Sequence, residues 1–149
     1  MNNLHIHIQP TVFNEIKNHL EASFPYEGCG FLFGEEKGSR VITKMVPALN
    51  NKTGDQRRRF EISPLDYMKA ERLALTEGLT LLGIYHSHPN HPAIPSEHDR
   101  IQAMPYFSYL ILSIQEGNFA KATSWRLKEE EQVFEEEQLT IYTPQGLNK

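Results

Sequence analysis

Hydrophobic residues recur along this chain with two different periods, and each period predicts a different kind of element. Apolar residues at helical spacing predict helices over 10–24, 64–78 and, more briefly, 96–104. Alternating or continuous apolar stretches, bounded by Gly, Pro or polar clusters, predict strands. These stretches cover 4–8, 26–34, 40–46, 60–62, 79–88, 106–114, 120–127 and 132–142. Strands interleaved with helices in this order predict an α/β fold, a mixed β-sheet flanked by helices.

Both long helices carry local signals for where they begin and which face they bury. Pro10 suits a first helical turn, and Ser63 followed by Pro64 places an N-cap before a proline at the first helical position. Gly78 is a stop signal. The side chains expected to face the core are Val12, Phe13, Ile16 and Leu20 in the first helix, and Leu65, Met68, Ala70, Leu73 and Leu75 in the second.

Histidines occur at alternate positions in two of the predicted strands. In the first strand, His5 and His7 share the face opposite the apolar residues, and with no acidic residue nearby we expect a solvated strand face. His86 and His88 instead end a buried strand and lead into a Pro-rich loop, after which Asp99 returns a carboxylate. Two imidazoles and one carboxylate leave a fourth tetrahedral position free, as in catalytic zinc sites. The spacing therefore predicts a metal site that can do chemistry.

The composition is that of an ordinary globular protein, and it excludes several classes of function. We expect one domain over 1–149, of which 39% is hydrophobic, with 143–149 as a frayed tail. A net charge of −4 gives no reason to expect a nucleic acid partner. Cys29 is the only cysteine, so a closed Cys-rich zinc cage is impossible and a reducing cytoplasm is the expected location. The sequence shows no signal-peptide pattern and no apolar stretch near the roughly 20 residues that span a bilayer, so no membrane partner is expected.

A hydrolytic zinc site needs more than ligands, because a base must accept a proton from the attacking water and a donor must hold the oxyanion. Glu27 lies at the mouth of the predicted strand 26–34 and can be the base; the alternative is a solvated glutamate at a strand edge. Ser96 can hold the oxyanion through its hydroxyl, although Ser-x-x-Asp is also a helix-capping pattern. Ser87, between the two histidines, faces away from the metal and is expected to support the loop or the ligands by hydrogen bonds.

The polar segment 50–59 has no apolar anchor and is expected to form a mobile loop. Its Arg57, Arg58 and Arg59 form the only strong basic cluster of the sequence, which is either solvated or part of a flap that faces the substrate. His91, in the loop after the histidine pair, is either a solvated residue or one that lines the mouth of the substrate site.

The candidate residues form one ordered motif. It consists of Glu27, the His-x-His pattern at 86–88, seven further residues, Ser96, two further residues and Asp99. This motif resembles the signature of the JAMM/MPN+ zinc metalloprotease family, and in particular its small prokaryotic branch. The sequence around Glu27, EGCGFLFG, and the order of predicted elements over nearly the whole chain are similar as well. A His-x-His pattern alone would be weak support, whereas the four-part motif is highly specific.

The resemblance implies a fold, a cofactor and a set of roles. The fold is the JAMM/MPN (cytidine-deaminase-like) architecture. The cofactor is one Zn²⁺ per chain, with His86, His88 and Asp99 as its ligands. Glu27 becomes the general acid/base for the attacking water, and Ser96 helps to stabilise the oxyanion. Water attacks the amide carbonyl directly, so no acyl-enzyme forms.

The resemblance also implies a class of substrate. Family members of this size resemble peptidases that release cargo from the C-terminal Gly-Gly tail of a ubiquitin-like or sulfur-carrier protein. Such a tail is extended and is expected to lie along a strand edge, where the loop 50–59 can cover it. A peptide substrate, with neither nucleic acid nor membrane involved, is therefore the expected partner.

Two other interpretations compete with the protease. RadC-like proteins, which are associated with DNA repair, have a similar ligand stretch that typically has the sequence HNHPSG, where this chain has HSHPNH. A non-catalytic scaffold or binding module of the MPN fold usually lacks one or more ligands, whereas this sequence retains the complete motif. A zinc nucleoside deaminase is excluded, because its Pro-Cys-x-x-Cys ligand pair is absent.

Overall fold

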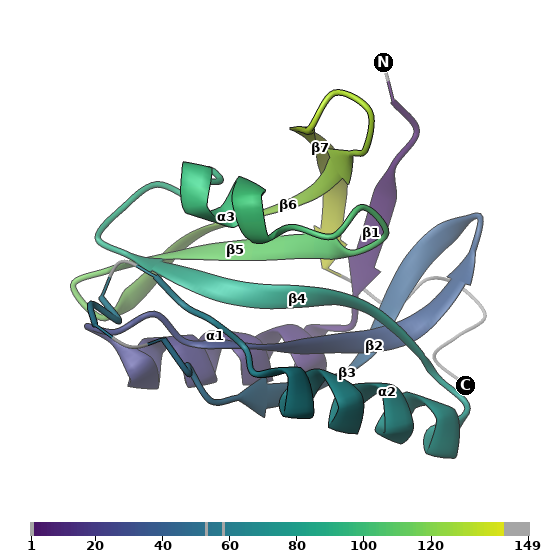
Figure 1. Cartoon of the computed structure of the whole chain (residues 1–149), viewed down its shortest axis with the longest axis horizontal. Coiled ribbons are helices and arrows are strands. Elements are labelled where there is room, and N and C mark those ends of the chain that lie inside the picture. Colours follow the sequence, from purple (N-terminus) through teal and green to yellow (C-terminus); the bar gives the residue numbers. More distant parts are fainter. Residues whose placement is uncertain (1, 53, 58, 142–149) are drawn as a thin grey trace.

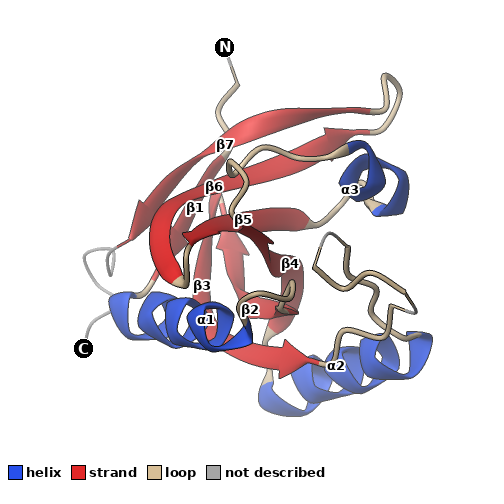
Figure 2. Ribbon diagram, turned by 90° about the vertical axis from the view of Figure 1, so that its left-hand side faces the viewer, coloured by secondary structure: helices blue, strands red, loops and turns tan. Residues whose placement is uncertain are grey.

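Within the residues that the computed structural model describes, 2–52, 54–57 and 59–141, seven strands form a mixed sheet that closes on itself (Figure 1 and Figure 2). The strands hydrogen-bond in the order β1-β3-β2-β4-β5-β6-β7, and β7 returns to β1. They are β1 (His5–Ile8), β2 (Cys29–Lys37), β3 (Ser39–Ala48), β4 (Thr80–Pro89), β5 (Ser108–Gln115), β6 (Asn118–Lys128) and β7 (Val133–Ile141). β1 is parallel to both of its neighbours and β4 is parallel to β5, whereas the other pairs are antiparallel. The predicted mixed α/β sheet is confirmed.

Three helices complete the described part of the chain, α1 (Pro10–Ser23), α2 (Pro64–Glu77) and α3 (Glu97–Gln102). In Figure 1, α1 and α2 lie below the sheet and α3 lies above it. Both faces of the sheet are buried along β4, β5 and the first part of β2. Leu32 of β2 contributes to the core around α1, whereas its neighbours Phe31 and Phe33 contribute to the core around α2, as alternation along a strand requires. Strands covered on both faces explain the continuous apolar stretches in the sequence.

The stripe predicted for α1 is confirmed. Its buried side chains are Val12, Phe13, Ile16 and Leu20. They pack against Ile6 and Ile8 of β1 and against Leu112 of β5. Because burial of one large apolar side chain contributes about 1.5–3 kcal/mol, this stripe is enough to hold the helix on the sheet.

Both ends of α2 follow the predicted signals. Ser63 Oγ accepts the Asp66 N–H at 3.1 Å and so caps the first turn. Gly78 takes the left-handed conformation, with φ of 68°, and its N–H bonds to carbonyls of the last turn. These local signals fix where α2 begins and ends.

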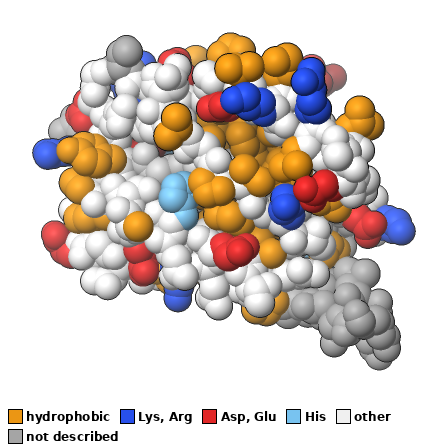
Figure 3. Space-filling model, turned by 90° about the horizontal axis from the view of Figure 1, so that it is seen from below, with side chains coloured by type: hydrophobic (Ala, Val, Ile, Leu, Met, Phe, Trp, Pro, Cys, Tyr) orange, Lys and Arg blue, Asp and Glu red, His pale blue; other side chains and the backbone are white. Residues whose placement is uncertain are grey.

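The buried face of α2 agrees with the prediction at Ala70 and at Leu73, which is partly buried against the core, and differs elsewhere. Ala70 and Ala74 are buried, whereas Leu65, Met68 and Leu75 are between 50% and 84% exposed. Two alanines one turn apart bring the helix close to the sheet along a narrow line, so the larger residues on either side remain at the surface. Figure 3 views the molecule from the side of α1 and α2 and shows apolar side chains gathered on this face. There α2 and β3 flank a groove of about 230 Å³.

Phe60 to Ile62 are buried but do not form the predicted strand. Phe60 is 5% exposed and Ile62 is 7% exposed, so the apolar alternation does mark buried residues. The backbone between them bonds to the preceding loop: Glu61 N–H donates to Asn50 Oδ1 at 3.1 Å, and Asn51 N–H donates to the Glu61 carbonyl at 2.7 Å. The polar backbone groups are therefore satisfied without a neighbouring strand.

The expectation that the first histidine pair is solvated is wrong for His7. Its side chain is 7% exposed, and its ring lies against that of His5, with the centroids 4.1 Å apart. His5 Nε2 is 2.8 Å from Thr140 Oγ1 of β7. Because β1 pairs along both edges, with β3 and β7, neighbouring side chains cover part of its polar face. Burial, with the charge of His5, lowers the pKa of His7.

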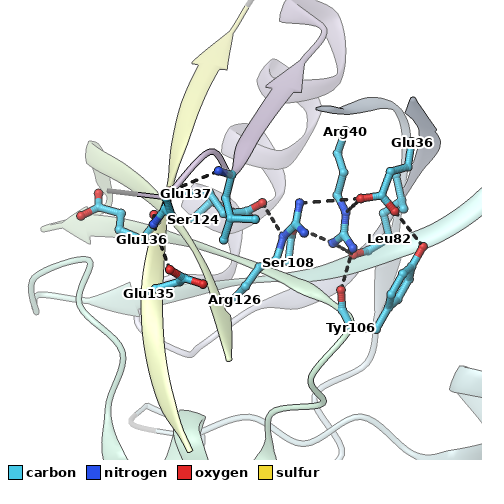
Figure 4. A network of polar contacts seen from close by, with 12 residues as sticks. Glu36, Arg40, Leu82, Tyr106, Ser108, Ser124, Arg126, Glu135, Glu136 and Glu137 are labelled. Carbon is cyan, nitrogen blue, oxygen red and sulfur yellow. Dashed lines mark hydrogen bonds and ion pairs between the residues drawn. The ribbon is translucent and has the colours of Figure 1, made fainter. Parts of the chain in front are cut away.

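A buried arginine joins four strands at one end of the barrel (Figure 4). Arg40 of β3 is 1% exposed. Its guanidinium donates to the Leu82 carbonyl at 3.1 Å and to the Ser108 hydroxyl at 2.9 Å. It also donates to the Tyr106 carbonyl at 2.8 Å and to a Glu36 carboxylate oxygen at 2.9 Å. Arg40 thus connects β2, β3, β4 and β5 through one side chain.

The network continues into β6 and β7. Arg126 Nε donates to Glu137 Oε2 at 2.7 Å, and Ser124 Oγ donates to Glu137 Oε1 at 2.7 Å. Arg126 also lies 3.8 Å from the Glu36 carboxylate. Glu137 is 2% exposed, so each of its oxygens has a partner where water has little access. The buried charges are paired, which is the condition for keeping them inside a protein.

Three smaller findings concern a thiol, the tail and membranes. Cys29 is buried, and burial, together with Glu27 and Asp66, raises the pKa of its thiol to about 12, so it is an inert core residue. The predicted frayed tail, 143–149, lies outside the described residues. Among the described residues, no helix combines the length and hydrophobicity that crossing a bilayer requires.

Candidate metal centre

The second histidine pair lies at the end of β4. This strand is buried from 81 to 89, because it lies between β2 and β5. His86 is fully buried and His88 is 6% exposed, and as alternate residues of a strand they point to the same side. The ring of Phe60 stacks on His86, with centroids 4.5 Å apart and planes inclined by 27°. Packing therefore fixes the orientation of the His86 imidazole.

Asp99 reaches the histidines because α3 begins beside them. Ser96 Oγ accepts the Asp99 N–H at 3.1 Å, and Asp99 Oδ2 accepts the Ser96 N–H at 2.8 Å, which makes a capping box. The same carboxylate faces both imidazoles. Its Oδ1 is 3.3 Å from His86 Nε2, and its Oδ2 is 3.1 Å from His88 Nε2. The residues that start the helix also deliver the third polar group.

The three side chains fit a metal ion, with one ligand atom from each lying within 4.8 Å of the others. His86 Nε2 and His88 Nε2 are 3.2 Å apart. Tetrahedral bonds of about 2.0–2.1 Å to zinc hold ligand atoms about 3.3 Å apart. His88 Nδ1 is 2.8 Å from the Pro92 carbonyl, so that nitrogen carries the proton and Nε2 keeps its lone pair. Two imidazole nitrogens and a carboxylate suit a transition metal better than calcium or magnesium.

Electrostatics favour the ligand forms of these side chains. Burial alone would raise the pKa of Asp99, but His86, His88 and the Ser96 N–H together hold it well below its ordinary value. Burial lowers the pKa of His86 and outweighs the attraction of Asp99. Near neutral pH the carboxyl group is ionised and the His86 imidazole is neutral, which are the forms that bind a metal.

Glu27 lines a pocket beside these ligands, just ahead of β2. It is 6% exposed, and its Oε1 has no hydrogen-bond partner among the described residues. Ser87 holds this segment: its Oγ accepts the Gly28 N–H at 2.9 Å, and its N–H donates to the Gly28 carbonyl at 3.1 Å. The pocket, of about 450 Å³, is also lined by His88, His91, Pro92, Ile94 and Ser96. The alternative of a solvated glutamate at a strand edge is therefore wrong.

The pKa of Glu27 predicts how stability depends on pH. Burial, then the charges of Asp99 and Asp55, raise this pKa from 4.5 to about 9. Between those values the folded protein keeps a proton that the unfolded chain has lost, so the stability of the metal-free protein falls as pH rises. Glu27→Gln is expected to match the wild type near pH 4.5 and to exceed it by roughly 2–4 kcal/mol at pH 8. Urea unfolding of both metal-free proteins across this range measures the difference, and a constant difference contradicts the prediction.

The polar loop after β3 is anchored beside Glu27. Glu27 N–H donates to the Gln56 carbonyl at 2.7 Å, and Asn50 Nδ2 donates to the Glu27 carbonyl at 3.1 Å. Asn50 also closes the base of the loop, through the Arg59 carbonyl at 3.0 Å and the Glu61 N–H at 3.1 Å. These bonds hold the described part of the loop next to the site, where the sequence predicts a mobile segment.

Of the remaining candidates that the structure describes, only His91 lines the pocket of the site. The Arg57 guanidinium is 5.8 Å from the ring centre of Tyr26, the residue before Glu27. Arg59 is exposed, and Arg58 lies outside the described residues. His91 is exposed and lines the pocket. Among the described residues, neither His91 nor the two arginines belong to the group of three that fits a metal ion.

Asn50 and Phe60 shape the site, yet no motif in the sequence identifies them. Paired asparagines after a strand indicate a turn, and a phenylalanine suits any buried segment. Their contacts with Glu27 and His86 depend on the path of the loop. Spacing along the chain does not specify that path.

The fold and the site together define a metal-dependent hydrolase. A buried His-His-Asp cluster lies at a pocket, and the same pocket is lined by an acidic side chain with an oxygen that has no hydrogen-bond partner in the described part of the chain. Metallohydrolases need an open coordination position and a nearby proton acceptor, and this arrangement provides both.

Comparison with known proteins identifies the family. The model of the prokaryotic homologs of the JAB domain matches residues 9–128, and the chain belongs to this family. A "Probable TtuB-protein conjugate cleaving protease" of Thermus thermophilus is 34% identical over 106 residues, which are 71% of this chain and 68% of the relative. A desampylase of Pyrococcus furiosus is 33% identical over 114 residues, 76% of each chain. The resemblance to JAMM metalloproteases is confirmed, and the protein is a hydrolase of that class.

Solved structures agree with this assignment. A protein from Desulfitobacterium hafniense superimposes with a TM-score of 0.80 at 27% identity, covering 91% of this chain and 92% of that one. A JAB1/MPN domain protein from Archaeoglobus fulgidus superimposes with a TM-score of 0.59 at 16% identity, covering 92% and 99%. The second likeness concerns the fold alone, and it confirms the predicted JAMM/MPN architecture.

Proposed function

We propose that the protein is a zinc protease that hydrolyses the amide bond after the C-terminal Gly-Gly of a ubiquitin-like or sulfur-carrier protein. The observation that carries the proposal is the position of Glu27. Its Oε1, which has no hydrogen-bond partner within the described ranges, is buried in the pocket that His88 also lines, next to the three side chains that fit a metal ion. The substrate class is supported by the names of the two relatives, which describe a protease for TtuB conjugates and a desampylase.

In the proposed site, His86, His88 and Asp99 hold one Zn²⁺ per chain. The Pro92 carbonyl orients His88, and the Ser96 N–H orients Asp99. Held there, the ion would polarise the scissile carbonyl, lower the pKa of a water molecule to about 7 and offset part of the upward pKa shift of Glu27. Ser87 supports the arrangement from the other side of β4 through Gly28.

Glu27 moves the protons in the proposed reaction. Its carboxylate accepts a proton from the attacking water and then delivers that proton to the leaving amine. Because burial raises the pKa of Glu27, its carboxylate is a stronger base than an exposed glutamate. The Gln56 carbonyl and Ser87 hydroxyl keep this segment in place through the N–H groups of Glu27 and Gly28.

Ser96 can serve the helix and the reaction together. Its Oγ accepts the Asp99 N–H as a cap, and that bond does not use the hydroxyl proton. Ser96 also lines the pocket. Its hydroxyl would therefore donate to the oxyanion of the tetrahedral intermediate.

A Gly-Gly tail suits the approach to this pocket. Glycines have no side chains, so an extended tail can lie close to the protein backbone. The loop after β3 is anchored next to Glu27, and we place its Arg57 and Arg59 facing the carrier protein. His91 lines the pocket and would contact the bound segment.

A fusion of a ubiquitin-like carrier to a short peptide through Gly-Gly tests the proposed function. The zinc-loaded protein is expected to cut after the second glycine, and a chelator is expected to slow this about 100-fold or more, because the ion drives the hydrolysis. One equivalent of Zn²⁺ per chain should restore the rate, with mass spectrometry defining the cleaved bond. A carrier that ends in Ala-Ala is the control and should stay intact. Failure of the folded, zinc-loaded protein to cut the Gly-Gly fusion contradicts the proposal.

A further inference from the structure

A second pocket adjoins the metal centre on the side of α3. It has a volume of about 250 Å³ and shares Ile94 and Ser96 with the pocket that contains Glu27. Its other lining residues come from the loop before α3, from α3, from β6 and from β7. They are Pro95, Glu97, Arg100, Trp125, Val133 and Phe134.

The walls of this second pocket are held in place. Trp125 Nε1 donates to Thr123 Oγ1 at 2.8 Å, and the Thr123 hydroxyl donates to the Ala93 carbonyl at 2.6 Å. Phe134 packs edge-on against Tyr109, with ring centroids 6.0 Å apart. These contacts tie the loop before α3 to β6 and fix both aromatic rings. The pocket is therefore formed before anything binds, as ligand pockets usually are.

The chemistry of the second pocket favours a large apolar side chain. Ile94 and Val133 are 63% and 48% exposed, so apolar surface is available next to the aromatic rings. Arg100 at the rim is paired with Glu97, Nε to Oε1 at 3.0 Å, so the rim offers little net charge to a charged side chain. The main favourable contribution to the free energy of binding in this pocket is therefore the removal of apolar surface from water.

We infer that this second pocket binds an apolar or aromatic side chain on the leaving-group side of the cleaved bond. The inference rests on the proposed function. With Gly-Gly on the acyl side, the two residues before the bond have no side chain, and the third lies about 7–10 Å further along an extended tail. A side chain that fills a pocket bordered by Ser96 must therefore follow the bond, or flank the modified lysine. Ile94, Trp125 and Val133 thus determine which acceptor is released.

Trp125 allows binding to be measured without hydrolysis, because it is the only tryptophan in the chain. We expect the tetrapeptide amides LAAA and FAAA to change its fluorescence with a Kd at least about tenfold lower than that of AAAA. Val133→Asp should abolish this difference by placing a charge in the pocket. Ile101→Asp is the matched control: it makes the same kind of change at an isoleucine of α3 that is 69% exposed and does not line the pocket. This control should keep the difference.

Hydrolysis of Gly-Gly fusions gives the second measurement. Fusions with Leu or Phe after the bond are expected to have a kcat/KM about tenfold or more above that of the Ala fusion, in the wild type and in Ile101→Asp. In Val133→Asp the fusions should be cut about equally. If the Leu and Ala probes bind equally and are cut equally, the inference is overturned, but the proposed protease function stands. The same holds if the preference for Leu survives in Val133→Asp. Selective fluorescence in a protein that cuts no fusion supports the pocket and contradicts the proposed function.

Discussion

Replacing Glu27 by Gln is expected to lower the kcat of the zinc-loaded protein by about 10²–10⁴-fold without loss of bound metal. Gln has nearly the same size and shape, but it neither accepts a proton from water nor delivers one to an amine. The metal should remain, because the ligand group consists of His86, His88 and Asp99. Single-turnover cleavage of a Gly-Gly fusion, with metal analysis of the same preparation, measures both quantities.

Two further variants separate the possible causes of a lost activity. Glu61→Gln is the matched control, because it makes the same change at an exposed glutamate in the segment that follows the anchored loop. It should keep both metal and turnover. His88→Ala is expected to lose both. A Glu27→Gln protein that turns over at the wild-type rate contradicts the acid/base role, and one that loses its metal would place Glu27 among the ligands.

Replacing Arg40 by Ala is expected to lower the free energy of unfolding by about 3–5 kcal/mol, since removing one member of a buried charged network leaves its partners unpaired. The variant would leave the Leu82 and Tyr106 carbonyls and the Ser108 hydroxyl without the guanidinium that binds them, and Arg40 itself is 1% exposed. For a chain of this length the loss corresponds to a fall of about 10 °C in Tm. Urea and thermal unfolding of the metal-free protein measure it.

Arg72→Ala is the control for this prediction, because it removes an exposed arginine from α2. Its effect should stay within about 0.5 kcal/mol. Leu82, which Arg40 holds, and His88 are six residues apart on β4, about 20 Å along the strand. The folded fraction of Arg40→Ala should therefore bind metal as the wild type does. An unfolding free energy equal to that of the wild type contradicts the structural role assigned to Arg40.

Local patterns in the sequence predict most helices and strands, because each depends on neighbours a few residues away. The caps of α2 at Ser63 and Gly78 and the buried stripe of α1 follow from such patterns. The failures arise where distant parts of the chain meet. Phe60 to Ile62 alternate like a strand but bond to Asn50, and His7 is covered because β1 pairs with β7. Closure of the sheet is a contact between the two ends of the chain that periodicity does not encode.

The residues of the candidate site also differ in how far the sequence predicts that they come together. His86, His88 and Asp99 come from one short stretch, a strand end followed by a capped helix, so their convergence can be expected from spacing. Glu27 is separated from them by about sixty residues, and only the family motif connects it to the ligands. Burial of its carboxyl group depends on a loop that no local rule places. Tertiary packing, rather than spacing, therefore sets the pKa of this group.

Because the first strand pairs with the last, the barrel can close only after β7 has been synthesised. Every residue from Glu27 to Asp99 precedes β6 and β7 in the chain, so the residues of the ligand cluster are synthesised while β1 still lacks one of its two partners. The barrel closes when β1 pairs with β7, and in this pairing His5 lies opposite Gln138, more than a hundred residues later in the chain. Because closing a loop of this length costs conformational entropy, we expect the pairing of β1 with β7 to form late in folding.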